Sequence, residues 1–323
     1  MLLVFGQVPA MAAATQPAAA DACAALDFTD EDASLSVLRR LYHEEQFAEL
    51  DAALDCLLQD QRRFSSGKPS SAIAYLLFRR QMMAPGATPA DLQRVQRWAQ
   101  QRPQSMFAEF AALRLRYAFA WNIRGGGFAS QITEAQMRGF TEGMAATEEA
   151  LRRASPTLRE ASLWHQMLLA VAGDHRLASG DMGTVFQEAV KRWPTNYDLH
   201  EVLLTRLVPL WGGSWEHVDG FIQHYAGQQA GPERDALYAR LYAGLLVTMR
   251  EDPRRTRVDW PRMKRGLEAL ASRYPEPRHL NLAASFACVY RDAAYLKSSL
   301  ARITPERRRP GAWLHGTDLN ACQ

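Results

Sequence analysis

The chain lacks an apolar run long enough to cross a membrane, because nothing after its first segment approaches the ~18 to 20 residues that such a helix needs. It also lacks an excess of charge, since 38 basic and 35 acidic side chains leave a net charge of +3. A near-balanced chain sets up no strong field for nucleic acid or an anionic membrane, so we expect neither as a partner. Lysine is scarce, with four residues, and we attribute the excess of arginine to compositional bias rather than to phosphate recognition.

Motifs that assemble a catalytic centre are also missing. The sequence contains no G-x-S-x-G elbow, no C-x-x-C pair and no H-E-x-x-H pattern. The glycines at 125–127 are not followed by the Lys-Ser/Thr of a phosphate loop. We interpret Asp174-His175 as part of a solvated loop rather than as an acid–base pair. The sequence therefore predicts a protein that is not an enzyme and that needs no cofactor or metal.

Cysteine is rare, with four residues in the chain. The even number fits an oxidising compartment, although four cysteines allow three pairings. We favour Cys288–Cys322, which would tie down the C-terminus, and Cys23–Cys56, which would do the same near the N-terminus. The alternative is that Cys56 and Cys288 are simply buried small apolar residues.

The first segment, residues 1–26, resembles the second half of a secretory signal. A short apolar run precedes small residues in A-x-A form at 10–12 and 18–20, but a positive n-region is lacking. We therefore expect a periplasmic or secreted protein, or a cytoplasmic one if this segment is only a disordered Ala-rich tail. The remaining chain is predicted to form one helical-repeat domain, residues 27–303, and an irregular tail, residues 304–323.

Apolar residues recur at helical spacing along the chain, and no segment alternates as a strand would. Thr88-Pro89, Ser155-Pro156 and the capping box Thr133-x-x-Gln136 are helix starts. The helices predicted from these patterns cover 35–43, 47–64, 71–83, 89–102, 104–121, 133–153, 156–172, 182–193, 195–207, a segment after Ser214, 233–249, 260–274, 279–290 and 292–303. Many helices joined by short turns predict an all-α fold of stacked antiparallel helix pairs.

Two helix endings, Arg192-Trp193-Pro194 and Arg273-Tyr274-Pro275, share a basic–aromatic–proline pattern. This pattern resembles the boundaries of tetratricopeptide repeats (TPR), although the full repeat consensus is absent. It favours a TPR-like α-solenoid, an α–α superhelix in which each helix pair packs on the next.

The segment 206–224 is predicted to be a corner between two helices. Pro209 ends the first helix, Gly212 and Gly213 permit a tight turn, and Ser214 caps the second helix.

Several segments resemble a bacterial family of unknown function, number 4034 among the domains of unknown function. They are Tyr117-x-x-x-Trp121-x-x-Arg124-Gly125, Pro209 to Ser214, Tyr238 to Tyr242, and Asn281…Cys288…Asp292 with Trp313 and Cys322. The similarity is expected to run through most of the chain from about Leu35. It implies a helical, repeat-like fold and often an exported protein, and it brings no activity with it.

Two clusters are candidate binding residues. Tyr117, Trp121 and Arg124 share one helix face, where they could stack on a sugar or clamp a peptide. The alternative is a packing stripe closed by a glycine C-cap. The second cluster, at the predicted corner, consists of Trp211, Trp215, Glu216 and His217.

These observations favour a non-enzymatic scaffold of the bacterial cell envelope that binds a protein or peptide partner. The alternative is a carbohydrate or cell-wall ligand binder, or a hydrolase, that uses the Trp/Glu corner, with Glu216 as its acid or base. A further alternative is an immunity or inhibitor protein that acts against a toxin.

Overall fold

The computed structural model describes residues 23–59, 62–81, 87–127, 129–177 and 180–322. In these ranges the chain forms fifteen α-helices and five short 3-10 helices. The only strand-like pairing in these ranges is one isolated bridge between Arg63 and Pro69. The predicted all-α class is therefore confirmed, and the predicted signal segment lies outside the described residues except for its last few positions.

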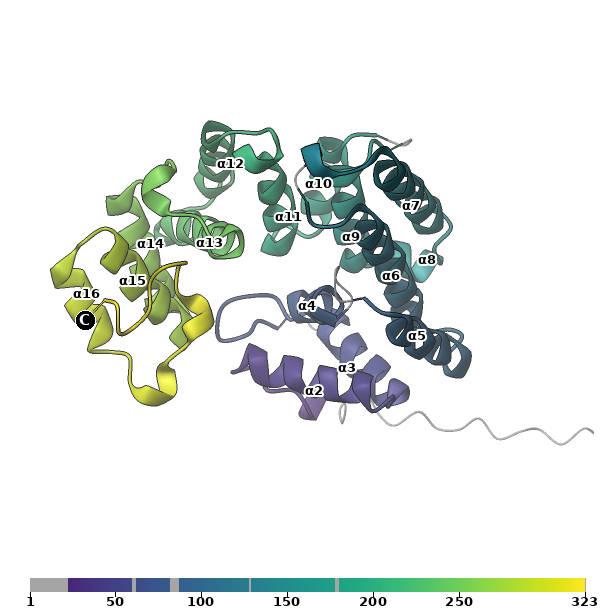
Figure 1. Ribbon diagram of the computed structural model, residues 1–323. Helices are drawn as coiled ribbons and strands as arrows, with labels where there is room; N and C mark the ends of the chain where they lie inside the picture. The colour runs from purple at the N-terminus through teal and green to yellow at the C-terminus, as the bar shows by residue number, and fades with distance from the viewer. Residues whose placement is uncertain (1–22, 60–61, 82–86, 128, 178–179, 323) are drawn as a thin grey trace, which may run out of the picture.

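The helices follow one another in sequence order, and most pack against the next in the chain (Figure 1). Their bounds are α2 Glu31–His43, α3 Phe47–Gln59, α4 Ser71–Gln81, α5 Pro89–Gln101, α6 Met106–Arg124, α7 Glu134–Arg152, α8 Pro156–Arg159, α9 Ser162–Asp174, α10 Met182–Arg192, α11 Tyr197–Leu207, α12 Trp215–Gly227, α13 Pro232–Met249, α14 Trp260–Arg273, α15 Pro277–Val289 and α16 Ala293–Leu300. The 3-10 helices are η1 Ala129–Gln131, η2 Pro209–Trp211, η3 Pro253–Arg255, η4 Pro305–Arg307 and η5 Pro310–Ala312.

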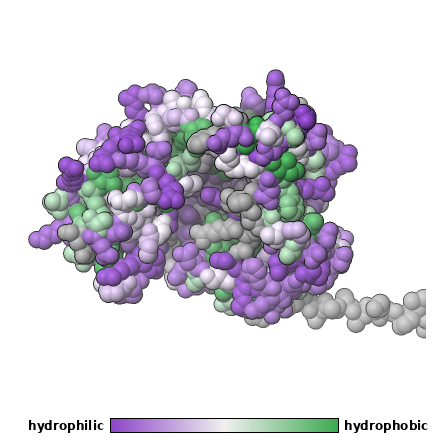
Figure 2. Space-filling view, in the orientation of Figure 1, coloured by the Kyte–Doolittle hydropathy of each residue, from purple (hydrophilic) through white to green (hydrophobic). Residues whose placement is uncertain are grey.

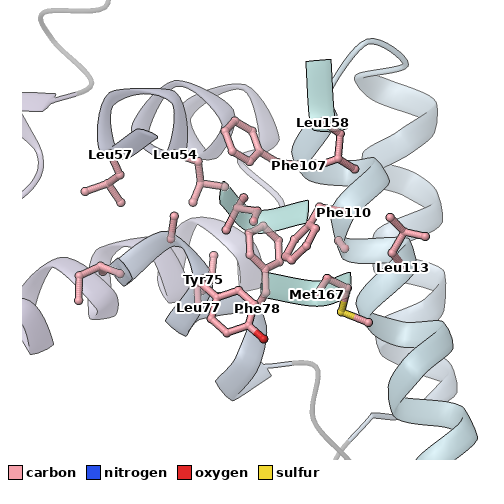
Figure 3. Packing of buried hydrophobic residues seen from close by; sticks show 14 of the residues in the cluster. Leu54, Leu57, Tyr75, Leu77, Phe78, Phe107, Phe110, Leu113, Leu158 and Met167 are labelled. Atoms are coloured by element: carbon pink, nitrogen blue, oxygen red, sulfur yellow. The ribbon is translucent and has the colours of Figure 1, made fainter. Parts of the chain in front are cut away.

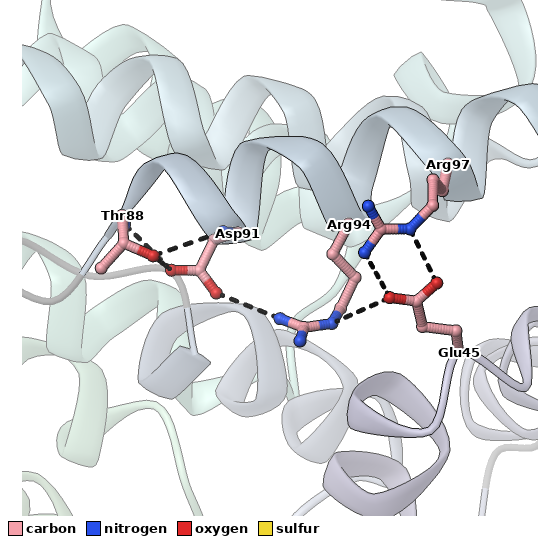
Figure 4. A network of polar contacts seen from close by, with 5 residues as sticks. All are labelled: Glu45, Thr88, Asp91, Arg94 and Arg97. Atoms are coloured by element: carbon pink, nitrogen blue, oxygen red, sulfur yellow. Dashed lines mark hydrogen bonds and ion pairs between the residues drawn. The ribbon is translucent and has the colours of Figure 1, made fainter.

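The predicted helix starts are reproduced by side-chain caps. Thr88 and Asp91 form a capping box at the start of α5, where the Asp91 carboxylate accepts from the Thr88 N–H at 2.9 Å. Figure 4 shows how this cap continues through Arg94 to Glu45, in the turn between α2 and α3. Arg97 also donates to Glu45, with Nε 2.8 Å from the carboxylate. The caps thus define the helix ends and also link α5 to the first helix pair.

Some predicted bounds were wrong. The helix predicted over 156–172 is divided into α8 and α9, because Ala161 is extended (φ −87°, ψ 149°) between them. This break lets Leu158 and Leu163 both be fully buried. Helix α3 ends at Gln59 rather than at Phe64, which lies instead in the loop that carries the Arg63–Pro69 bridge.

The predicted corner after α11 is present. Pro209 opens η2, Gly212 adopts a left-handed φ of +86°, and Ser214 Oγ accepts from the His217 N–H at 3.1 Å at the start of α12. A Cβ on Gly213 would lie 2.0 Å from the carbonyl oxygen of Leu207. The two glycines are therefore required by the turn itself.

Two large apolar cores support the fold, one mainly between α2 and α11 and one mainly between α11 and α15. Figure 3 shows part of the first core, where Phe78 and Phe110 pack edge to face with centroids 4.9 Å apart. Trp98 of α5 is fully buried in the same core, and its Nε1 donates to Asp51 at 3.1 Å. Helix α11 contributes to both cores, so it joins the two halves of the molecule.

The first and last thirds of the chain meet at the loop 62–70, so the helices are arranged in a ring (Figure 1). The carbonyl oxygen of Ser66 accepts from Arg240 of α13 at 2.9 Å and lies 3.1 Å from Nε2 of His279 of α15. Both side chains are buried, and burial lowers the pKa of His279 to about 4. His279 is therefore neutral at pH 7 and donates through Nε2. We call this set of contacts the ring closure.

Two disulfides staple the described chain, Cys23–Cys56 and Cys288–Cys322, with Cα atoms 5.7 and 5.6 Å apart. This is the pairing that the sequence analysis favours. The second disulfide fixes the C-terminal tail on α15, where Leu314 N–H donates to Ser285 Oγ at 2.9 Å. No helix in the described ranges is both long enough and apolar enough to span a membrane.

Candidate functional site

A cavity of about 240 Å³ lies inside the ring of helices. Its walls come from α4, α6, α9, α11 and α13, together with Lys68 of the loop 62–70. Figure 2 shows that the surface is hollowed near the middle of this face, while hydrophilic side chains dominate its outer rim. The lining residues are Lys68, Ala72, Ile73, Tyr75, Leu76, Arg79, Arg114, Tyr117, Ala170, Asp198, Glu201, Val202, Thr205, Arg206, Gly244, Leu245 and Thr248.

Charged side chains of both signs line this cavity, and two of them have ion-pair partners. Lys68 lies 3.6 Å from Glu31, and Arg206 lies 2.6 Å from Asp174. The other four are Arg79, Arg114, Asp198 and Glu201, and none of them takes part in an ion pair within the described residues. We call these four the cavity charges.

Arg114 is the most deeply buried of the cavity charges, with 3% of its surface exposed. Its guanidinium lies over the rings of Tyr75 and Tyr117, 5.8 and 5.1 Å from their centroids. Its only hydrogen bond in the described structure is to Met167 Sδ at 3.4 Å, and Nε has no partner. Burying a cation without an anion is costly, so an anionic group of a ligand beside Arg114 would be stabilising.

Asp198 and Glu201 lie three residues apart on α11, so they share one helix face. The pKa of Asp198 is raised to about 6, first by burial and then by the nearby Glu201 carboxylate, whereas Lys68 and Arg79 act in the opposite direction. The Glu201 carboxylate packs over Gly244 of α13, where a Cβ would lie 2.6 Å from its Oε1. The first half of α11 therefore contributes two carboxylates to the cavity, whereas Arg206 near its end is paired with Asp174.

Next to the cavity, Asp174 at the end of α9 is surrounded by donors. Its carboxylate accepts from Tyr117 Oη at 2.6 Å and from Trp121 Nε1 at 3.0 Å, and it pairs with Arg206. Its side chain is 4% exposed. The sequence interpretation of Asp174 as part of a solvated loop was therefore wrong, because α9 continues through Asp174 and places it among these donors.

Tyr117 and Trp121, from one predicted cluster, donate to Asp174, and Trp211, from the other cluster, packs against Trp121. Trp211 meets Trp121 edge to face at 6.3 Å, and its ring lies 5.2 Å from the Arg206 guanidinium. Trp211 is 44% exposed. The three aromatic residues thus connect the cavity wall, to which Tyr117 belongs, with an outer surface at η2.

Arg124 lies on the same face of α6, but its guanidinium donates to backbone carbonyl groups just after the helix. It is 9% exposed, lies over Trp121, and donates through Nη1 to the carbonyl oxygens of Gly125 at 3.1 Å and Gly127 at 3.4 Å. Gly125 is the C-cap of α6, with φ +77°. This geometry is the glycine-capped packing stripe that the sequence analysis gives as its alternative.

We call Asp174 with Tyr117, Trp121 and Arg206 the Asp174 cluster. No contact is described between this cluster and the other corner residues, Trp215, Glu216 and His217. Trp215 is half-buried against the second core, and His217 is exposed. Glu216 is also exposed and pairs with Arg257, whose hydrogen bond holds the pKa of Glu216 below its usual range. A carboxylate that stays ionised is poorly suited to act as a general acid.

Comparison with known proteins adds one match, to a family model described as Domain of unknown function (DUF4034), over residues 34–172. Residues 34–172 form a DUF4034 domain. No curated protein and no solved structure matches the chain. The DUF4034 match begins where the sequence resemblance places it and includes the Tyr117–Gly125 motif. It ends before the Pro209–Ser214 corner, so the corner and the later segments that the resemblance cites lie outside it.

The DUF4034 domain supplies one wall of the cavity, with Arg79 and Arg114, whereas Asp198 and Glu201 come from α11, outside the match. Sequence analysis did not select any of these four residues. One signal was present, because Arg114 interrupts an apolar face of α6 that continues through Tyr117 and Trp121. In the described ranges no group of three or more His, Cys, Asp or Glu side chains is placed to hold a metal ion.

Proposed function

We propose that this protein is a non-enzymatic binding scaffold that holds a peptide, or a segment of a protein partner, in its central cavity. The observation that carries the proposal is the set of cavity charges, four ionic side chains from three helices that remain without ion-pair partners around one space. Buried charges are normally paired, so charges left unpaired around a cavity are suited to a ligand that pairs them.

The size of the cavity supports a small occupant. The cavity volume of about 240 Å³ is somewhat below the usual range of small-molecule pockets, about 300–1,000 Å³. Such a space accepts one or two residues of a peptide rather than a folded domain. The closed arrangement of helix pairs is consistent with a TPR-like superhelix, which we propose as the finer description of the fold.

The two disulfides support a location in the bacterial cell envelope or outside the cell. Disulfides persist in oxidising compartments and are rare in a reducing cytosol. A periplasmic or secreted location is therefore part of the proposal.

The carbohydrate alternative has less support from the geometry. Trp211 offers an exposed ring, but Arg206 and Trp121 already occupy part of its surroundings. Glu216, the acid that this alternative requires, is paired with Arg257 on the outer surface.

A peptide selection with a matched pair of variants tests the proposal. Thr205 lines the cavity, whereas Thr141 is exposed on α7. We expect a random 12-residue peptide library to yield peptides that bind the wild-type protein and Thr141→Trp, but not Thr205→Trp, which fills the cavity. Peptides that bind all three proteins equally, or a selection that yields no binder, would contradict the proposal.

A further inference from the structure

The cavity charges are arranged by sign on different walls. Arg79 of α4 and Arg114 of α6 are the basic pair, and Asp198 and Glu201 of α11 are the acidic pair. Lys68 and Arg206, which also line the cavity, already have carboxylate partners in Glu31 and Asp174. The unpaired charge in the cavity therefore consists of two cations and two anions that no described ion pair joins to one another.

A ligand that carried one kind of charge would satisfy only half of this arrangement. An anion alone would pair the guanidinium groups and leave Asp198 and Glu201 beside added negative charge. A cation alone would pair the carboxylates and leave Arg114 buried without a partner, which is the costly condition that already exists. A ligand that carries both charges would complete both pairs at once.

We propose, building on the peptide-binding function above, that the ligand is a zwitterion, a short peptide with free ends whose carboxylate lies at Arg79 and Arg114 and whose ammonium lies at Asp198 and Glu201. Guanidinium groups bind carboxylates with charge-assisted and often bidentate hydrogen bonds. Arg114 lines the cavity without a carboxylate partner, and its guanidinium is held in place by the rings of Tyr75 and Tyr117.

The acidic pair has matching properties for an ammonium group. Asp198 and Glu201 face the same space from adjacent turns of α11, and the bulk of Glu201 rests on Gly244. Asp198 has no hydrogen bond or ion pair in the described structure, and burial raises its pKa. An ammonium group within ion-pair distance would lower that pKa again.

The experiment compares three forms of one dipeptide mixture by isothermal titration calorimetry at pH 7.5, namely unmodified, N-acetylated and C-amidated peptides. We expect the unmodified mixture to bind and each cap to weaken binding at least about tenfold. Inorganic phosphate serves as the probe for a simple anion site, and it is expected to bind more weakly than the unmodified peptides.

Two variants test which side chains bind the carboxylate end and which bind the ammonium end of the peptide. Arg79→Gln is expected to weaken the unmodified and N-acetylated forms but to leave the affinity of the C-amidated form unchanged. Asp198→Asn is expected to show the opposite pattern, with no further loss for the N-acetylated form. Both residues are only partly buried, and helical circular dichroism checks that both variants fold.

A protein chain that ends in lysine presents the same two charges as a short peptide. A 12-residue peptide with a C-terminal lysine and an acetylated N-terminus distinguishes this source, because it binds only if the side-chain ammonium replaces the free amino end. Binding of either source supports the charge assignment.

Equal affinity for capped and unmodified peptides, or phosphate that binds as tightly as the peptides, would overturn the zwitterion proposal. If the 12-residue selection yields Thr205→Trp-sensitive peptides while no free-ended peptide binds, the proposed function stands and the zwitterion assignment fails. If neither kind of peptide binds, both proposals fail.

Discussion

Asp198 lines the cavity and Asp174 lies next to it, but the two carboxylates have different surroundings. Asp174 receives two hydrogen bonds, from Tyr117 and Trp121, and an ion pair from Arg206. Asp198 has no hydrogen bond or ion pair in the described structure and depends on longer-range attraction to Lys68 and Arg79. Burial raises the pKa of both carboxylates. The comparison indicates that the chain itself neutralises the first carboxylate and leaves the second available to a ligand.

The largest expected effect comes from removing Asp174. Asp174→Ala leaves the mostly buried Arg206 and the donors of Tyr117 and Trp121 without their acceptor, so we expect a loss of about 3–5 kcal/mol in the free energy of unfolding. Urea denaturation followed by circular dichroism measures it. A loss no greater than that of an exposed control such as Asp32→Ala would show that the cluster is not a structural centre.

Asp198→Asn is expected to act in the opposite direction. Because the pKa of Asp198 is raised from 3.8 to about 6 in the folded protein, the folded state binds more protons than the unfolded state between these values, and stability falls as pH rises through about 6. At pH 7 the variant should therefore be more stable than the wild type, by on the order of 1–3 kcal/mol.

The difference between Asp198→Asn and the wild type should shrink as the pH falls from about 6 toward 4 and should vanish below 3.8, where the carboxyl is protonated in both states. Urea unfolding at pH 4, 5, 6 and 7 follows this trend. If the difference in the free energy of unfolding does not change with pH, the pKa of Asp198 is not raised by folding.

Trp211 gives an intermediate effect, because it covers Arg206 from the outside. Trp211→Ala is expected to cost about 1 kcal/mol, since it removes a partly exposed cation–π contact. Leu210→Ala is the matched control, because Leu210 is 62% exposed on the same turn. If the two variants lose equal stability, Trp211 does not support the Asp174 cluster.

The smallest effect is expected at Glu216. Glu216→Gln breaks an exposed ion pair with Arg257, and such pairs contribute little in water. We expect no measurable change in the urea midpoint at 0.15 M salt. A clear loss of stability would show that the α12 surface carries more of the fold than its exposure indicates.

Much of the fold follows from local sequence signals. Thr88, Thr133 and Ser214 each cap the helix that the sequence assigns to them, and these caps depend on residues within a few positions. The break between α8 and α9 could not be predicted in the same way, because it depends on how Leu158 and Leu163 are buried by other helices.

The candidate site was less predictable. Tyr117 and Trp121 stand out as an aromatic pair on one helix, but their acceptor Asp174 lies more than fifty residues away, at the end of a different helix. The cavity charges come from α4, α6 and α11, and only the packing of these helices brings them to one space. The spacing of these residues along the sequence does not indicate that they lie close together in the folded protein.

The ring closure has a consequence for how anything enters the interior. One backbone carbonyl, that of Ser66, accepts from both Arg240 and His279, so these contacts join the first third of the chain to its last third. A ligand too large for the opening of the cavity can enter only when these contacts break. Its association rate constant would then depend on how often they break. Hydrogen exchange of the backbone amides in the loop 62–70 would report how often these contacts break.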